Sequence, residues 1–325
     1  MTTILQDSYA GPGARHEALL YTSADEFASL TAPFVAEGLD KDESAVVVTS
    51  AENLEAFQAA LAEPSPLVLL ADGEDWYRNP AETIGRWVGF VEGQVARGRS
   101  RVRGVGEIAP LRRDQAVEQW LQYESILNTL LAPLPLSVLC AYNTEVLPES
   151  IIEGVRKSHP TVIEDGSASA SESYLPPSGP PTRPLALDDR QTLTHQPGDV
   201  ADTCTYVEAE ARRAGLAEWQ MQQLLAAAGE VAHNAFLHGS APVFVTAWEE
   251  HESFVCQIED DGGGIVDLAA GYMPPTNGND GWGLWLARQL TDSLEIGRGP
   301  YGSAVRLTMH PSRPKPPRGT LPTRL

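Results

Sequence analysis

Cysteines are few in this sequence and long hydrophobic runs are missing. The 325 residues include three cysteines, Cys140, Cys204 and Cys256, which are far apart and form no CxxC pair. This pattern suggests neither a disulfide framework nor a zinc site, and it fits reduced thiols inside a cell. No apolar run approaches the roughly 20 residues of a membrane helix. The N-terminus lacks the basic and apolar regions of a signal peptide. We therefore expect a cytoplasmic protein with no membrane partner.

Positive charge is also scarce. The chain has 23 Lys and Arg residues against 44 Asp and Glu residues, which gives a formal net charge of −21. A nucleic acid or an anionic membrane would repel such a chain, so we expect neither as a partner. The segment 215–287 contains no Lys or Arg at all. Any anion bound there depends on backbone groups, a metal ion or cations from elsewhere in the chain.

The composition divides the chain into four parts. Residues 164–189 are rich in small polar residues and proline, so they predict a linker with no face to bury. A basic, proline-rich stretch closes the chain and predicts a disordered tail. The resulting boundaries are an N-terminal domain at 1–163, a linker at 164–194, a C-terminal domain at 195–312 and a tail at 313–325.

The N-terminal domain alternates β-rich and helical segments. Apolar runs predict strands at 45–50, 66–71, 100–106 and 136–142. Helical patterns lie at 23–37, 51–62, 80–96 and 113–131. Such alternation is typical of an α/β domain with a mainly parallel sheet, whose ligands bind beyond the carboxyl ends of the strands.

The C-terminal domain has another order of elements. Two helices at 200–214 and 217–238 precede strands at 242–249 and 254–260. A Gly/Pro/Asn-rich stretch, a short helix beginning near residue 284 and strands at 293–298 and 303–309 follow. This order predicts an α/β sandwich, with a mixed sheet and helices on one face.

Two polar residues interrupt the second of these helices. Glu230 and Asn234 are four residues apart, so they lie on the same side of an otherwise apolar, alanine-rich helix. Two solvent-facing residues would be the simple explanation, but the many apolar neighbours leave little room for a broad polar face. An amide oxygen is a suitable Mg²⁺ ligand, and a carboxylate one turn away can accept a proton or orient a water molecule.

Two glycine motifs follow this helix. Asp260 stands at a predicted strand end before Gly262 and Gly264, and Gly281 and Gly283 directly precede the short helix. Glycines allow a ligand to approach the backbone closely, and a helix N-terminus offers unpaired N–H groups to an anion. Each motif alone is also compatible with an ordinary turn or helix entry, whereas their order and spacing together are more specific.

The three motifs resemble the N box and the two glycine boxes of the Bergerat, or GHKL, ATPase fold. The resemblance covers about residues 195–310 and includes "GSAVRL" at 302–307, which matches the last family strand. It implies ATP and Mg²⁺ as cofactors, Glu230 as the catalytic base, Asn234 as the metal ligand and Asp260 as the acceptor of the adenine amino group. The remaining residues implied to contact the nucleotide are Gly262, Gly264, Gly281, Gly283, Leu284 and Ser303. Residues 265–283 correspond to the lid.

Within this fold, the domain resembles the anti-sigma-factor serine/threonine kinases. No helical pair carrying a phospho-acceptor histidine precedes it, and the lid is short. The resemblance implies a sigma factor or a STAS-domain antagonist as the partner. However, the segment 215–287 lacks a basic residue, and only Arg288 or Arg306 remain as candidates to neutralise a triphosphate. The alternative is therefore a non-catalytic, ATP-gated module that sequesters a sigma factor or its antagonist.

The N-terminal domain has no phosphate-binding loop, because its first predicted strand is not followed by G-x-x-x-x-G-K-[ST]. Arg99, Arg101 and Arg103 would share one face of a strand. We favour a solvated edge for them over an anion or partner site.

The same domain resembles the MEDS sensory domain, which is distantly like RecA/KaiC folds. The matching pieces are "HEALLYTSADEF", "FVEGQVARGRSRVRGVGE", "LCAYN" and "SHP", and the resemblance covers about residues 14–162. It implies a small-molecule ligand site that includes His16 and Cys140. Two such residues do not form a metal site by themselves, and a Cys at a strand end is usually part of the core. Together the two resemblances imply a sensor that controls a signalling ATPase. They leave open the sensed ligand and whether the chain forms a homodimer.

Overall fold

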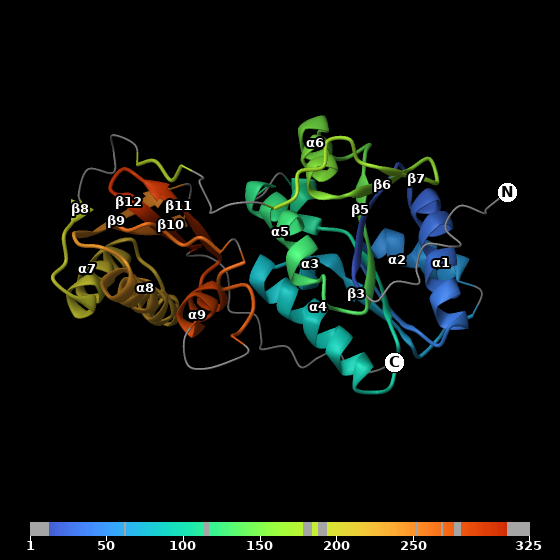
Figure 1. The fold of residues 1–325 in the computed structure, drawn as a ribbon, viewed down its shortest axis with the longest axis horizontal. Helices are drawn as coiled ribbons and strands as arrows, with labels where there is room; N and C mark the ends of the chain where they lie inside the picture. Colours follow the sequence, from blue (N-terminus) through green and yellow to red (C-terminus); the bar gives the residue numbers. More distant parts are fainter. Residues whose placement is uncertain are drawn as a thin grey trace. The chain divides into compact units, whose positions relative to one another are not determined.

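The structure is a computed structural model that describes residues 13–61, 63–113, 117–177, 184–187, 194–250, 253–267, 269–275 and 281–310. The chain divides into two compact units, residues 1–177 and 178–325, and each unit is considered separately (Figure 1). Among the described residues, no helix is both long enough and apolar enough to cross a membrane.

Seven strands form a single sheet in the first unit, in the order β3-β2-β4-β5-β1-β6-β7. They are β1 (Arg15–Tyr21), β2 (Ser44–Thr49), β3 (Val68–Asp72), β4 (Val102–Gly106), β5 (Leu136–Asn143), β6 (Thr161–Glu164) and β7 (Ser167–Ala170). Every neighbouring pair is parallel except the hairpin of β6 and β7. The predicted mainly parallel α/β domain is confirmed.

Helices cover both faces of this sheet (Figure 1). They are α1 (Ala24–Asp40), α2 (Ala51–Ala60), α3 (Gly73–Trp76), α4 (Pro80–Val95), α5 (Val117–Leu130) and α6 (Glu149–Ser158), with a 3₁₀ turn η1 (Ala109–Arg113). The sequence sets several of the helix starts. Ser23, Ser50 and Asn79 each accept a backbone N–H of the first helical turn, which satisfies a donor that the helix leaves unpaired.

Side chains alternate between the two faces along each strand, and this alternation positions the site in this unit. Leu19 and Leu139 pack with α1 and α2 in one apolar cluster. On the other face, Gly104 lies against Trp87 of α4 and beside Val138. His16 pairs with Val138 in the parallel register of β1 and β5, so it shares this second face with Cys140, two residues further along β5.

The expected solvated edge of arginines is wrong. Strand β4 lies inside the sheet, between β2 and β5, so the side chains at this position are enclosed. Arg103 is fully buried, and its Nε lies 2.6 Å from a carboxylate oxygen of Glu43. Arg101 is 6% exposed and donates to the carbonyl of Gly13. Arg99 forms an ion pair with Asp42. Arg101 and Arg103 therefore belong to the interior of the domain, Arg99 is paired at its surface, and the three are not arranged as an anion site.

The second unit contains a five-stranded sheet in the order β11-β12-β10-β9-β8. The strands are β8 (Thr194–His195), β9 (Val243–Glu250), β10 (Ser253–Asp260), β11 (Ser293–Gly299) and β12 (Gly302–Met309). Helices α7 (Val200–Arg213), α8 (Glu218–His238) and α9 (Trp282–Leu290) pack on it through one apolar core. The predicted α/β sandwich is confirmed. The named strands pair antiparallel, and among the described residues the parallel pairing in this sheet is a bridge between Pro184 and Arg298.

The segment predicted as a linker contains an exposed strand and a buried residue, Leu185, contrary to the expectation that it has no face to bury. Strand β7 (Ser167–Ala170) completes the first sheet. Leu185 is 1% exposed, and its N–H donates to the carbonyl of Arg298 at 2.7 Å. Gln257 donates to the carbonyl of Leu185 at 3.0 Å. The linker residues 178–183 and 188–193 and the predicted tail, 313–325, lie outside the described residues.

Candidate functional site

Helix α8 presents Glu230 and Asn234 toward the start of helix α9. A Cβ placed on Gly283 would lie 2.7 Å from Glu230 Oε2 and 3.5 Å from Asn234 Nδ2. Both polar residues are half-buried, while Val231 and Ala235 beside them are buried in the core. Neither polar side chain forms a hydrogen bond or ion pair with the described part of the chain. The N-box pair and the second glycine motif therefore meet, and the polar groups remain available to a ligand.

The N-terminus of α9 is shaped by glycine. Gly281, which precedes the helix, has φ of +93°, in the left-handed region that favours glycine. No side chain of the described residues caps this helix end, so its first N–H groups are available to an anion. Leu284 packs against the apolar core and fixes the helix on the sheet. The predicted lid, 265–283, includes residues 268 and 276–280, which lie outside the described residues.

Asp260 organises the turn that follows β10. Its Oδ1 accepts the N–H groups of Gly262 at 2.8 Å and Ser240 at 3.2 Å. A Cβ on Gly262 would lie 2.5 Å from this oxygen, and Gly264 has φ of +87°, so both glycines are required by geometry. Ser303 is the register partner of Asp260 on β12. The other carboxylate oxygen of Asp260 has no hydrogen bond to the described residues, so it can accept one from a ligand.

Helix α8 connects these two groups of residues. Its C-terminal residue is followed by Gly239, where a Cβ would lie 2.5 Å from the carboxyl carbon of Asp260. The same helix carries Asn234 and Glu230 one and two turns earlier. One rigid element therefore sets the distance between the Asp260 turn and the polar pair at the start of α9.

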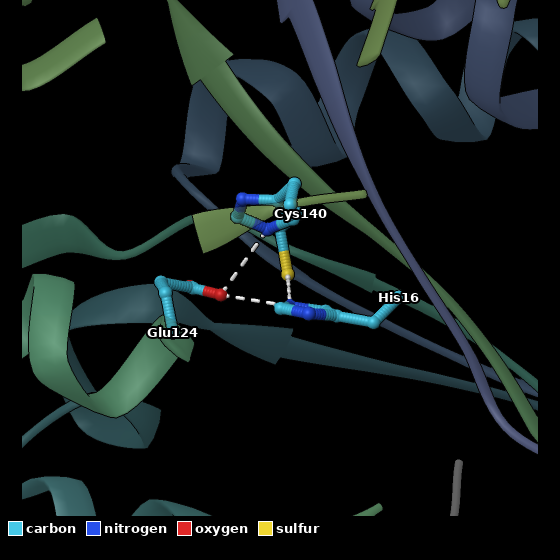
Figure 2. A group of neighbouring side chains, drawn as sticks. His16, Glu124 and Cys140 are labelled. Carbon is cyan, nitrogen blue, oxygen red and sulfur yellow. Dashed lines mark hydrogen bonds and ion pairs between the residues drawn. The ribbon is translucent and has the colours of Figure 1, made fainter. Parts of the chain in front are cut away.

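A second group of chemically active residues is buried in the first unit (Figure 2). His16 Nε2 lies 2.8 Å from Glu124 Oε2 and 3.3 Å from Cys140 Sγ. His159 Nε2 lies 3.3 Å from the same Glu124 oxygen. The four ligand atoms all lie within 4.8 Å of one another. The predicted neighbours His16 and Cys140 are thus brought together, and the structure adds Glu124 and His159 to them.

Burial sets the protonation of this group. Burial would raise the pKa of Glu124, but the neighbouring imidazoles of His159 and His16 outweigh it and hold that pKa below its ordinary value. Burial and the negative charge of Glu124 raise the pKa of the Cys140 thiol. Burial, followed by the charge of His16, lowers the pKa of His159. Glu124 is therefore the ionised member of the group.

Comparison with known families agrees with this division. Residues 15–160 match the model of MEDS, the MEthanogen/methylotroph, DcmR Sensory domain. Residues 193–309 match the model of the histidine kinase-like ATPase domain. The chain joins a MEDS domain to a histidine kinase-like ATPase domain. No curated protein matches the chain. The predicted order of the two domains is confirmed.

The residues of the ATPase domain fit a bound nucleotide. This family implies ATP as the cofactor, usually with Mg²⁺. The free oxygen of Asp260 suits an adenine amino group, and the uncapped start of α9 suits phosphate oxygens. Asn234 offers an amide oxygen to a metal ion beside these phosphates. The individual roles of these residues, and of Gly264 and Ser303, remain predictions.

Neither Arg288 nor Arg306 is placed to neutralise a triphosphate, contrary to the expectation from the sequence. Arg288 is 4% exposed, stacks 3.8 Å from the centre of the Tyr272 ring and donates to two backbone carbonyls. Arg306 donates to the side chain of Gln257 and to the carbonyl of Ala186. Because both guanidinium groups hold structural contacts, a bound metal ion would be the main positive charge beside the phosphates.

Sequence reasoning missed Glu124 and His159. Glu124 had a readable signal, because it lies on the buried face of α5 together with Trp120 and Leu127. A carboxylate at such a position requires a partner. His159 directly follows the end of α6, and no local pattern distinguishes it from a packed histidine.

Proposed function

We propose that this chain is a signalling regulator in which the MEDS domain controls an ATP·Mg²⁺-dependent serine/threonine kinase of the anti-sigma-factor type. The observation that carries the proposal is the meeting of Glu230, Asn234 and Gly283 at the uncapped start of α9. The expected partner is a sigma factor or a STAS-domain antagonist. The two domain families support the coarser role, a sensor joined to a kinase-like ATPase.

Each polar side chain has a distinct role in this mechanism. ATP supplies the phosphoryl group when bound, with its phosphates beside the start of α9. Asn234 offers its amide oxygen to Mg²⁺, and Asp260 orients the adenine. Glu230 accepts the proton of the attacking serine or threonine hydroxyl. Bound ATP would supply its γ-phosphoryl group to the oxygen of that hydroxyl, and ADP would be the leaving group.

A second function has an observation in its favour. The segment 215–287 contains no Lys or Arg, and Arg288 and Arg306 hold structural contacts. With little positive charge to stabilise a transition state, the domain would bind ATP only to shape a surface that holds the partner. In this alternative, Asn234 contributes to nucleotide affinity, while Glu230 has no role in catalysis.

The deciding experiment incubates the full-length chain with labelled ATP·Mg²⁺ and candidate STAS proteins from the same genome. We expect transfer by the wild type, about a 10²–10⁴-fold slower rate for Glu230→Ala with nucleotide affinity kept, and weak Mg·ATP binding for Asn234→Ala. His233→Ala is the matched control, because His233 is exposed on the same helix. Partner binding without transfer by the wild type would favour the alternative. Unchanged binding and transfer in both variants would show that the pair is structural.

A further inference from the structure

The hydrogen bonds behind His159 determine which of its nitrogens faces the buried group. Nδ1 lies 2.9 Å from the carbonyl oxygen of Val155, and a carbonyl can only accept, so Nδ1 carries a proton. In the neutral ring, Nε2 then holds a lone pair. This atom is buried, lies 3.3 Å from Glu124 Oε2 and forms no hydrogen bond among the described residues. It therefore faces the carboxylate as a ligand atom would.

His16 is oriented in the same way by Asn128. The Asn128 amide nitrogen donates to the carbonyls of Ser158 at 2.7 Å and Ser125 at 3.2 Å, which fixes the orientation of the amide. Its oxygen therefore faces His16 Nδ1 at 3.2 Å and accepts a hydrogen bond from the N–H group there. The other ring nitrogen, Nε2, is directed at Glu124 and Cys140. Hydrogen bonds that fix the outer nitrogen of a histidine in this way are typical of metal-ligating histidines.

The converging atoms need a positive charge between them. Two imidazole nitrogens, a carboxylate oxygen and a sulfur meet in a space from which solvent is excluded. The second oxygen of Glu124, Oε1, is also buried and lacks a hydrogen bond within the described residues. Buried lone pairs that face one another are costly unless a proton or a metal ion lies between them. A divalent ion with one carboxylate and one thiolate would give a centre with no net charge.

We propose that His16, Glu124, Cys140 and His159 bind one zinc-type divalent metal ion in the MEDS domain. Two nitrogens, one sulfur and one oxygen are the donor set that Zn²⁺ accepts, whereas Mg²⁺ and Ca²⁺ require oxygens. Bond lengths of about 2.0–2.3 Å in a tetrahedron place ligand atoms about 3.3–3.6 Å apart. Three of the six separations, 2.8, 3.3 and 3.3 Å, approach this spacing, and the others are within 4.8 Å. On binding, the Cys140 thiol becomes a thiolate and its proton passes to solvent.

An open pocket gives the ion a route to this centre. The pocket, of about 460 Å³, is lined by His16 and Asn128 and by residues of β6 and β7, among them Thr161 and Ser169. His16 thus directs Nε2 at the buried group, while the residue also lines the pocket. The proposal goes beyond the proposed function, because it assigns a ligand to the sensory domain whether or not the ATPase domain transfers phosphate.

Cobalt is the probe for the test, because Co²⁺ accepts the same ligands and absorbs light. The full-length chain is stripped with a chelator and titrated with Co²⁺, and then Zn²⁺ is added. We expect one Co²⁺ per chain, the strong visible absorption of a tetrahedral complex, a near-ultraviolet thiolate charge-transfer band and displacement by Zn²⁺. Cys140→Ser should lose the charge-transfer band, and His159→Gln should weaken binding at least about 10-fold.

Cys204→Ser and His195→Gln are the matched controls, since neither residue belongs to the buried group. Both should bind Co²⁺ with the wild-type spectrum. A charge-transfer band that survives in Cys140→Ser would overturn the proposal. Circular dichroism shows whether a variant is folded. If Cys140→Ser or His159→Gln fails to fold, the wild-type spectrum decides: less than one Co²⁺ per chain, weak octahedral absorption or no thiolate band also overturns it.

Discussion

Glu230 of helix α8 lies against Gly283 of helix α9. The carboxylate of Glu230 occupies the space that a side chain at position 283 would need. A Cβ at Gly283 would lie 2.7 Å from Glu230 Oε2, which is closer than real Cβ contacts. A side chain at the second glycine of this motif would therefore require the Glu230 carboxylate to move. This glycine does more than start a helix, because it determines where the carboxylate of Glu230 can lie.

Gly283→Ala should displace this carboxylate. We expect phosphoryl transfer to fall about 10²-fold, as misplacement of a catalytic group by about 1 Å can cause, with an unfolding free energy lowered by about 1 kcal/mol. Gly263→Ala is the control, because nothing lies within 4 Å of a Cβ at Gly263. Transfer assays and thermal unfolding of both variants provide the comparison. Equal activity of the two variants would contradict the packing role of Gly283.

Asp260→Asn should reduce adenine recognition. The Asn oxygen can still accept the N–H groups of Gly262 and Ser240, but its NH₂ group would then face the adenine amino group, donor against donor. We expect a loss of about 1–3 kcal/mol in ATP binding by calorimetry, with the affinity for inorganic triphosphate unchanged. Asp261→Asn, at the exposed neighbouring position, should bind ATP as the wild type does. A parallel loss of triphosphate binding would refute the adenine role.

Glu43→Gln should destabilise the MEDS domain strongly. It removes the negative charge 2.6 Å from the fully buried guanidinium of Arg103, whose other ion pair, with Glu37, is longer at 3.4 Å, and breaking a buried pair costs about 3–5 kcal/mol. Asp42→Asn removes the adjacent ion pair with Arg99, in which Asp42 is largely exposed, so the cost should be about 0–1 kcal/mol. Urea unfolding, with hydrogen exchange of β4 to assign the transition, measures both. Similar losses of unfolding free energy in the two variants would show that the cost of breaking an ion pair here does not depend on its burial.

Glu259 predicts a pH dependence in the ATPase domain. Burial raises the pKa of Glu259 above its ordinary 4.5, although hydrogen bonds from Gln257 and the Tyr301 N–H oppose the shift. Between pH 4.5 and the folded-state pKa, the folded state holds this proton and the unfolded state does not. The contribution of protonated Glu259 to the stability of the folded state is thus lost as pH rises through this window.

Glu259→Gln removes this titration. The unfolding free energy of the variant relative to the wild type should therefore increase between about pH 4 and pH 7. Urea unfolding at both pH values tests the prediction. A difference that does not change with pH would contradict it.

The candidate nucleotide site could be predicted from the sequence because its motifs are local. Glu230 and Asn234 share one helix, and the glycines of each box lie within a few residues of their partners. The strand β1 was not predicted, because its first residues, Arg15, His16 and Glu17, do not resemble a buried strand. These polar residues begin strand β1, which carries His16 of the buried group. Sequence reasoning failed here because the start of this strand does not follow the apolar pattern of a buried strand. The choice of His16 reflects the chemistry of the buried group more than a preference for strand structure.

The remaining failures concern partners that are distant in sequence. Arg103 lies 60 residues from Glu43, and no local pattern shows that they pair. His16 and Glu124 are separated by 108 residues, and they meet only because β1 inserts between β5 and β6. The order of strands in a parallel sheet depends on crossovers, which the alternation of elements does not specify.

The order of its four residues along the chain also determines when the buried group can form. His16 belongs to the first strand of the MEDS domain and His159 directly follows its last helix, so a ribosome must have released nearly the whole domain before they can meet. A nascent chain holds only scattered His, Glu and Cys side chains, each free to bind other partners. Assembly of this centre is therefore a late event in synthesis, and a chain truncated before residue 159 cannot complete it.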